Sequence, residues 1–470
     1  MDRFAIKLLM LAALAAIGGL RAEAQKLSSG DSRIDEAFQL ALRTLDSNTH
    51  DGLIHVGAGY GGEWTRDAAI NCWNAASLLR PQTAEKTLWS VTDDGFRIKH
   101  QYWDKIIWTI AAWNHYCVTG DEGFLREAYY CASRTMAELE DSCYERNYGL
   151  FMGPAVFQDG IAGYDEPVYD PAKWDDSFVL HHKYALTIKC LSTNIIYCQS
   201  YNVLSMMAAE LGDTAAPRYR QCAERLKESI VKHFYNKDGG KLYYLLDHRG
   251  VPHAYQEGMG TAFALLFDIL APAEAERMMD SLHITPHGIP AVYPSFPRNT
   301  PDKPGRHNMM IWPHVNMLFA SGCARHGRLD LFDFEMQNLA ELALSHDGGN
   351  FYEIYTLEGE PSGGWQCGAL WGKMSHQTWC ATGFLRIILS NVFGLTPTAA
   401  GLELHPVGMA GGYRCKLSGI RWRDAEISIT VRGHGTNIAS CKVNGIDSKA
   451  LIPADAKGRM DIVVTLVNSE

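Results

Sequence analysis

The sequence lacks several features that would place it in a common class of protein. Beyond the N-terminus it has no apolar run of the roughly 20 residues that a membrane-spanning helix needs. Basic residues are not in excess, with 43 Lys and Arg against 53 Asp and Glu. This balance argues against nucleic acid or another polyanion as a partner. The 12 cysteines form no C-x-x-C pair, which excludes the usual zinc-ribbon and thioredoxin spacings.

Motifs of several common hydrolases and of cofactor-binding proteins are also missing. The sequence contains no H-E-x-x-H and no G-x-S-x-G. Residues 57–62 match G-x-G-x-x-G, but a dinucleotide site needs a strand before the match and a second strand about 20 residues later. Helical periodicity follows instead, so we interpret this segment as the rim of a loop. We expect no metal or nucleotide cofactor.

The first 24 residues are typical of a cleaved signal peptide. Arg3 and Lys7 give a positive start, residues 8–20 are apolar, and the segment 22–24 supplies a small-x-small cleavage pattern. We therefore expect a periplasmic or secreted protein with no membrane insertion after cleavage; a retained membrane anchor is the alternative. Export permits disulfides, but many of the cysteines occupy apolar helical patterns, and we expect mostly buried free thiols.

Helical periodicity dominates the chain from residue 34 to residue 393. Long loops rich in Gly, Pro, Trp and Tyr interrupt it, and loops of this length inside a compact domain usually carry function. These loops are 51–65, 147–191, 283–310 and 346–373. The predicted helices are 34–47, 66–80, 84–96, 104–119, 122–140, 192–212, 215–234, 257–270, 272–282, 311–326, 329–345 and 374–393.

The character of the sequence changes near residue 397. Short alternating runs such as 427–431 and 462–466 follow, with Gly-rich turns between them, and this pattern is typical of strands. We predict a mainly α protein with a helical catalytic domain over 25–396. A small β-sandwich-like domain is expected over 397–470.

Two acidic residues in separate loops are the candidates for catalysis. Asp159 stands among glycine and apolar residues in the loop 147–191, and such surroundings favour a protonated carboxyl that can act as a general acid. Glu353 lies among aromatic residues in the loop 346–373; an exposed strand-edge position is its alternative. The other acids of the first loop look solvated, and a calcium site among them is a minority alternative. Those acids are Asp165, Glu166, Asp170, Asp175 and Asp176.

Candidates for substrate binding lie mainly where loops enter helices. Trp64, Arg66 and Asp67 form one such entry; carboxylates and guanidinium groups can each hold two neighbouring hydroxyls, and an indole can form a wall. The alternative for this segment is a capped helix start with an internal salt bridge. We expect the remaining candidates to line the same mouth. They are Gln256, Glu257, Trp312, His314, Trp365 and Gln366.

Several of these segments resemble the six-hairpin glycosidases. They are Trp64-Thr65-Arg66-Asp67, Gln256-Glu257-Gly258, Trp312-Pro313-His314-Val315-Asn316, Tyr352-Glu353-Ile354-Tyr355 and 377–383. The resemblance covers roughly residues 30 to 410 and is nearest to the α-glucosidase and mannosylglycerate hydrolase branch. It implies an (α/α)6 toroid and an inverting mechanism with Asp159 as acid and Glu353 as base. It also implies that Trp64 and Asp67 form the floor of the sugar site. Around the acid, Phe157-Gln158-Asp159-Gly160-Ile161 departs from the α-glucosidase pattern.

The function that we predict from the sequence is an exported, inverting exo-glycosidase that cleaves α-linked sugars from oligosaccharides or other glycosides. An inverting hydrolase needs one carboxylic acid to protonate the leaving oxygen and one carboxylate to activate a water. The alternative substrate is an α-L-rhamnoside. Alternatives of another class are a non-catalytic carbohydrate-binding protein and a sugar epimerase or lyase on the same toroid.

Overall fold

The structure is a computed structural model that describes residues 24–60, 62, 64–166, 168–412 and 414–467. The signal peptide expected over residues 1–24 lies, apart from Ala24, outside these described residues. None of the helices within them is both long enough and apolar enough to cross a membrane.

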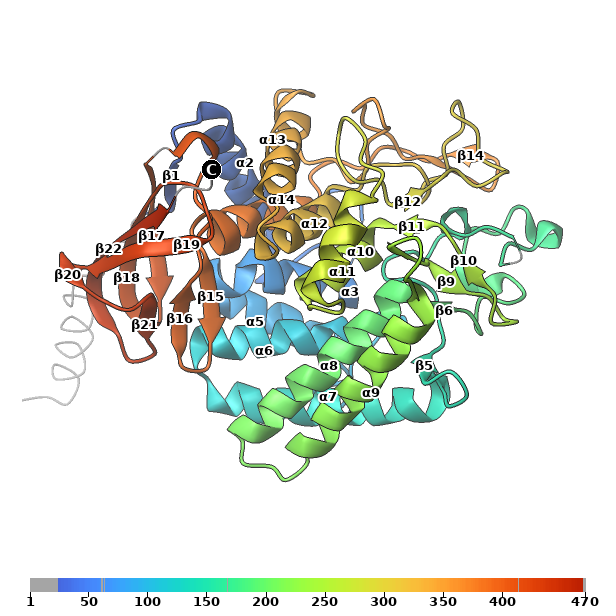
Figure 1. The fold of residues 1–470 in the computed structure, drawn as a ribbon, viewed down its shortest axis with the longest axis horizontal. Coiled ribbons are helices and arrows are strands. Elements are labelled where there is room, and N and C mark those ends of the chain that lie inside the picture. Colours follow the sequence, from blue (N-terminus) through green and yellow to red (C-terminus); the bar gives the residue numbers. More distant parts are fainter. Residues whose placement is uncertain (1–23, 61, 63, 167, 413, 468–470) are drawn as a thin grey trace, which may run out of the picture.

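Helices recur along the chain up to Val392, close to the places that the periodicity predicts (Figure 1). The predicted helices 66–80 and 374–393 each contain a wider π-helical turn, at Cys72–Ala76 and Ile387–Val392. The helices are α2 (Ser32–Ser47), α3 (Thr65–Asn71), α4 (Ser77–Leu79), α5 (Pro81–Ser90), α6 (Ile107–Thr119), α7 (Glu122–Cys143), α8 (Leu191–Glu210), α9 (Ala216–Phe234), α10 (Gly258–Leu266), α11 (Pro272–Asp280), α12 (Pro313–Arg325), α13 (Leu329–Leu344) and α14 (Thr378–Arg386).

Six of the helices form the inside of the helical region. α3 packs against α6, α6 against α8, α8 against α10, α10 against α12, α12 against α14, and α14 against α3. Helices α10 and α12 are buried along almost their whole length, as expected for helices that are apolar on every face. By contrast α9 buries one stripe, which includes Leu226 and Ile230, and exposes the opposite charged face.

The C-terminal part of the chain is rich in strands, as the alternating pattern predicts. A six-stranded sheet has the order β1-β17-β18-β22-β19-β20, and β15-β16-β21 form a second sheet. The N-terminal strand β1, which the sequence analysis places with the helices, pairs antiparallel with β17, Leu27 facing Leu417. The strands are β1 (Lys26–Ser28), β15 (Leu395–Thr398), β16 (Gly401–Leu404), β17 (Cys415–Trp422), β18 (Asp424–Arg432), β19 (Asn437–Val443), β20 (Ile446–Asp447), β21 (Leu451–Pro453) and β22 (Lys457–Val467).

Short hairpins shape the long loops. They lie beyond the end of the helical region that faces away from the C-terminal sheet, on the right of Figure 1. Two examples are β11 (Gln256–Glu257) with β12 (Val292–Tyr293), and β13 (Trp365–Gln366) with β14 (Ala369–Leu370). The cysteines are free and mostly buried, as expected, Cys72 and Cys380 among them. The shape of the loops therefore comes from hydrogen bonds and packing.

A buried glutamate fixes the loop before α12. Glu335 of α13 is fully buried; its carboxylate accepts hydrogen bonds from the backbone N–H of Ile289 at 2.9 Å and from Nδ2 of Asn316 at 3.0 Å. Both donors would lose this partner if the carboxylate were removed. A buried donor without a partner costs about 1–3 kcal/mol.

We predict that Glu335→Ala lowers the free energy of unfolding by about 2–4 kcal/mol, because two buried donors lose their acceptor. Denaturant unfolding followed by circular dichroism measures the change. Glu341→Ala on the same helix is the matched control, since Glu341 forms an exposed ion pair with Arg33, a type worth about 0–1 kcal/mol. Equal losses in the two variants would contradict the role given to Glu335.

Candidate active site

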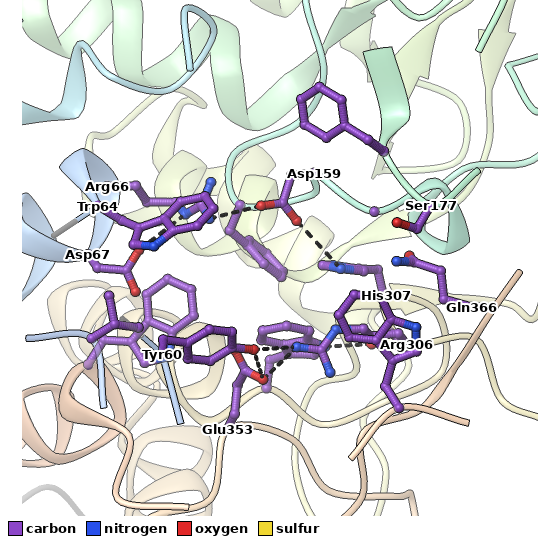
Figure 2. Close-up of a pocket in the computed structure, with 17 residues that line it drawn as sticks. Tyr60, Trp64, Arg66, Asp67, Asp159, Ser177, Arg306, His307, Glu353 and Gln366 are labelled. Atoms are coloured by element: carbon purple, nitrogen blue, oxygen red, sulfur yellow. Dashed lines mark hydrogen bonds and ion pairs between the residues drawn. The ribbon is translucent and has the colours of Figure 1, made fainter. Parts of the chain in front are cut away.

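A cavity of about 330 Å³ opens among the long loops and the first residues of the inner helices. Figure 2 shows Asp159 at one side of this central cavity and Glu353 at another, with Trp64 and Asp67 beside them. The loops 147–191 and 346–373 therefore reach one cavity, although they are far apart in the sequence. The described lining residues are Val56, Tyr60, Trp64, Arg66, Asp67, Phe157, Asp159, Gly160, Ser177, Phe178, Arg306, His307, Trp312, Glu353, Gln366, Trp371 and Trp379.

Arg66 lies on one side of the cavity and forms ion pairs with the acidic side chains around it. Its guanidinium lies 2.7 Å from Asp104, 3.3 Å from Asp159 and 3.8 Å from Asp67. Burial alone would lower the pKa of Arg66, but the three carboxylates, Asp104 first, raise it above its usual value. Arg66 therefore remains charged and holds three acidic side chains from three segments around it.

Asp67 is buried behind this guanidinium, at the first turn of α3. Burial raises the pKa of Asp67 to about 7, against the lowering effect of Arg66; Glu353 and Asp159 raise the pKa further. Near neutral pH the Asp67 carboxyl is therefore divided between its two protonation states. In the protonated state it can donate a hydrogen bond to a hydroxyl oxygen, and in the ionised state it can accept one.

The side chain of Asp159 is 28% exposed, so one of its faces is open to the cavity. Its Oδ2 lies near Arg66, and its Oδ1 lies 3.9 Å from Nε2 of His307. The expectation of an apolar setting for Asp159 is therefore wrong, because a guanidinium from another segment approaches it. Burial lowers the pKa of His307 well below its usual value, so this imidazole is neutral.

Glu353 is held by three side chains on its own side of the cavity. Arg306 donates to Oε2 at 2.6 Å, the Tyr60 hydroxyl donates at 2.9 Å, and Gln377 donates to Oε1 at 3.1 Å. The side chain of Glu353 is only 6% exposed, so it is not a strand-edge residue in solvent. These donors fix the carboxylate in one orientation toward the cavity.

Aromatic rings form much of the remaining wall. Phe157 packs against Trp312 with ring centroids 5.0 Å apart, and Trp379 lies edge-on to Phe157 at 6.4 Å. Trp64 and Trp371 line the cavity from the segment before α3 and from the late loop. A cavity of carboxylates among indole rings suits a sugar, whose hydroxyls bind the former and whose apolar faces pack on the latter.

A close contact joins the two loops beside Asp159. A Cβ atom added to Gly160 would overlap the side-chain oxygen of Gln366 and the ring of His307. Gln366 also accepts a hydrogen bond from the backbone N–H of Ala162 at 3.4 Å. The glycine after Asp159 therefore allows the late loop to pack directly on the early one.

Four of the predicted binding residues do not line the central cavity. Gln256 is occupied by hydrogen bonds with the backbone of His283, and Trp365 lies in a hairpin under Lys303. Glu257 is buried and accepts a hydrogen bond from the backbone N–H of Ser192, the second residue of α8. His314 is buried behind Trp379, against which its ring stacks at 3.9 Å. For Gln256, Glu257 and His314 the cause is the same: a helix entry can turn its side chains into the core as well as toward the mouth.

Sequence reasoning missed Tyr60, Arg306, His307 and Trp379, all of which line the cavity. Tyr60 lies in the Gly-rich loop and Arg306 in the long loop 283–310. The sequence marks both loops as candidates, but no local motif distinguishes these two residues. Their role appears only when each meets Glu353.

No group of three or more His, Cys, Asp or Glu among the described residues is arranged to hold a metal ion. Three other acids of the loop 147–191 have partners of their own. Asp165 is buried and 2.9 Å from Nδ1 of His253, Asp176 is 2.9 Å from His181, and Asp170 caps a short helical turn. None of these acids lines the central cavity.

Comparison with known proteins gives a family match and a set of similar folds. The model of the mannosylglycerate hydrolase MGH1-like glycoside hydrolase domain matches residues 60–379. A GH63 mannosylglycerate hydrolase from Thermus thermophilus, solved with glucose, is similar at 14% identity and a TM-score of 0.58, over 75% of this chain and 99% of that one. No curated protein sequence matches the chain.

Rhamnosidases also have a similar fold. A GH78 family rhamnosidase of Bacillus sp. GL1 is 12% identical with a TM-score of 0.56, over 95% of this chain and 44% of that one. A rhamnosidase from Klebsiella oxytoca with rhamnose bound is 12% identical with a TM-score of 0.56, over 76% of this chain and 64% of that one.

We predict that Arg66→Ala lowers the free energy of unfolding by about 3–5 kcal/mol at pH 8, because three carboxylates lose their shared cation. The loss should be smaller at pH 5. Without the guanidinium the folded-state pKa values of Asp67 and Asp104, which burial already raises, rise further, so these carboxyls ionise at a higher pH in the variant than in the parent and the penalty grows as the pH rises. Chemical denaturation at the two pH values measures both losses.

Arg80→Ala is the control for this prediction, since Arg80 forms an exposed pair with Asp46 at 2.8 Å. We expect a loss below about 1 kcal/mol that changes little with pH. A loss in Arg66→Ala that is independent of pH would contradict the charge argument.

Proposed function

We infer the function of this chain from its family: it belongs to the mannosylglycerate hydrolase MGH1-like glycoside hydrolases. It is a glycoside hydrolase. We propose that it is an exported, inverting, exo-acting enzyme that cleaves an α-linked sugar from an oligosaccharide or another glycoside.

The observation that carries this proposal is the pair of carboxyl groups from two distant loops at one small cavity. Asp159 and Glu353 both line it, and indole rings supply much of the rest of the wall. The volume of about 330 Å³ is at the low end for a small-molecule site, which favours a single terminal sugar over an extended chain.

In this proposal Glu353 is the general base and Asp159 the general acid. Glu353 takes a proton from a water that attacks the anomeric carbon, while Asp159 gives a proton to the leaving oxygen on the other side of the ring. Arg306, Tyr60 and Gln377 donate to Glu353, which keeps the carboxylate in place for the water. Because Arg66 contacts Oδ2 of Asp159, the proton is best held on Oδ1.

We assign the sugar-binding roles to side chains that line the same cavity. Trp64 and Trp312 pack on the ring of the sugar, and Asp67, Arg66 and Gln366 bind hydroxyls. The pKa of about 7 lets Asp67 act as donor or acceptor without a change in its position. No metal or other cofactor is needed for the proposed chemistry.

The architecture that we propose is an (α/α)6 toroid with a small C-terminal β-domain. The contacts that lead from α3 through α6, α8, α10, α12 and α14 back to α3 support an inner ring. Outer helices α5, α7, α9 and α13 each pack on a member of it. The proposed boundaries are 25–396 for the helical domain and 397–470 for the β-domain, after a signal peptide over 1–24.

An α-L-rhamnosidase is the second candidate. The observation that favours it is the likeness to the Bacillus rhamnosidase, which extends over 95% of this chain and therefore includes the strands that follow α14. A panel of aryl α-glucosides, α-mannosides and α-L-rhamnosides, with the first-formed anomer assigned by NMR, decides between the candidates. A first-formed sugar of retained configuration would overturn the inverting mechanism.

We predict that Glu353→Ala loses about a thousandfold in kcat, because a positioned base and the water that it holds are both removed. Added azide should restore part of the rate and give a glycosyl azide of inverted configuration, which NMR identifies. Glu358→Ala is the control from the same loop, with an exposed side chain, and should remain within about twofold of the parent. Full activity in Glu353→Ala would remove Glu353 as the base.

We predict that Asp159→Asn slows substrates with poor leaving groups far more than activated aryl glycosides, because only the former need a proton on the leaving oxygen. Steady-state kinetics on matched alkyl and nitrophenyl glycosides measure the difference. The control is Glu360→Gln, an exposed acid of the loop 346–373. Equal losses on both substrates would exclude Asp159 as the acid; Asp165, Glu166 and Asp175 would be the next candidates.

A further inference from the structure

A second cavity, of about 620 Å³, lies between the helices and the C-terminal strands. Helices α6, α8, α12 and α14 line it, together with strands β15 and β16. We call it the far cavity and define it by Trp73, Trp113, Asn114, Gln199, Phe267, Ser321, Arg325, Arg386, Asn391, Glu403 and His405.

The far cavity and the central cavity are at opposite ends of the same helices. Trp379, near the beginning of α14, lines the central cavity, whereas Arg386, its last residue, lines the far cavity. Likewise Trp312 precedes α12, and Arg325 ends it. At 1.5 Å per residue, the seven positions from Trp379 to Arg386 span about 10 Å along the axis. The far cavity is therefore separate from the site of the proposed hydrolysis.

Arg386 is the unusual residue of the far cavity. It is partly buried, and it makes no ion pair or hydrogen bond with any described residue. Its buried Nε has no acceptor among them, and its guanidinium lies over the indole of Trp73, 4.2 Å from the ring centroid. The other cations of this cavity are paired, Arg325 with Asp268 and His405 with Glu403.

An unpaired guanidinium in a partly buried position is costly, because neither water nor a carboxylate compensates its charge fully. Burial accordingly lowers the pKa of Arg386 to about 10, and no nearby carboxylate opposes the change. Guanidinium groups bind carboxylates through two parallel hydrogen bonds. A carboxylate that enters the far cavity would satisfy Arg386 in this way.

We propose that the far cavity binds a small organic carboxylate the size of a monosaccharide, through an ion pair with Arg386. The indole of Trp113 offers a flat wall for the apolar face of such a ligand, while the ring of Trp73 is already covered by Arg386 and stacked on Phe267. The side chains of Asn114 and Gln199 offer amides for its hydroxyls. These walls, together with the volume of the far cavity, favour a sugar acid over a simple ion.

The test is isothermal titration calorimetry of the full-length protein with D-glucuronate, and with D-glucose as the neutral probe of the same size. We expect glucuronate to bind at least tenfold more tightly than glucose. Arg386→Gln should weaken glucuronate binding at least tenfold and leave glucose binding unchanged. Arg386→Lys keeps the charge but loses the paired donors, so an intermediate affinity is expected.

Arg325→Gln is the matched control, because Arg325 lines the same cavity but is already paired with Asp268. It should bind glucuronate as the parent does. Glucuronate binding that survives Arg386→Gln, or no glucuronate binding by the parent, overturns the proposal. Equal affinity for glucose and glucuronate also overturns it.

The melting temperature, measured by thermal unfolding, shows whether each variant is folded and gives a second measure of glucuronate binding. Glucuronate should raise the melting temperature of the parent and of Arg325→Gln, but not that of Arg386→Gln. Hydrolysis at the central cavity should stay within about twofold of the parent in Arg386→Gln, because Arg386 lies at the other end of α14. A failure of the hydrolysis proposal would therefore leave the calorimetric result interpretable.

Discussion

The burial of Arg66 among Asp67, Asp104 and Asp159 is the interaction on which the rest of the site depends. The three carboxylates come from the start of α3, from the segment before α6 and from the loop 147–191, so one guanidinium joins segments that the chain separates. Asp104 also accepts the backbone N–H of Phe157 at 3.2 Å, two residues before Asp159. Arg66 thus fixes the position of Asp159, the proposed acid, and Asp159 in turn helps to stabilise the charge of Arg66.

A second cation, Arg306, holds Glu353 on the opposite side of the site. Among the described residues Arg306 forms an ion pair with Glu353 alone, while Arg66 is shared by three acids. The two proposed catalytic carboxyls, those of Asp159 and Glu353, therefore have different electrostatic surroundings, and this difference is built into the protein itself. Because the donors to Glu353 come from the Gly-rich loop, the loop 283–310 and the segment before α14, three separate segments must be in place before this carboxylate is oriented.

The sequence predicts the helices from the helical spacing of their apolar residues, and it predicts the C-terminal strands from the alternation of residues such as 427–431. It identified Asp159, Glu353, Trp64 and Asp67 as residues of one cavity because unusual side chains mark their loops. It could not identify Arg306 or Tyr60, whose importance arises from contact with Glu353 and not from their neighbours in the chain. It misplaced Gln256 and His314, since the register of a helix entry decides which side chain faces inward.

The pairing of β1 with β17 has a consequence for how the molecule is made. Lys26 faces Ser418, so β1 can pair only after the helical region and β17 have been synthesised. Until that moment β17 offers an open edge and the sheet lacks its outer strand. Contacts between such distant segments form slowly, because the intervening chain must first become compact. Closure of this edge therefore requires that the helical region between the two strands is already compact.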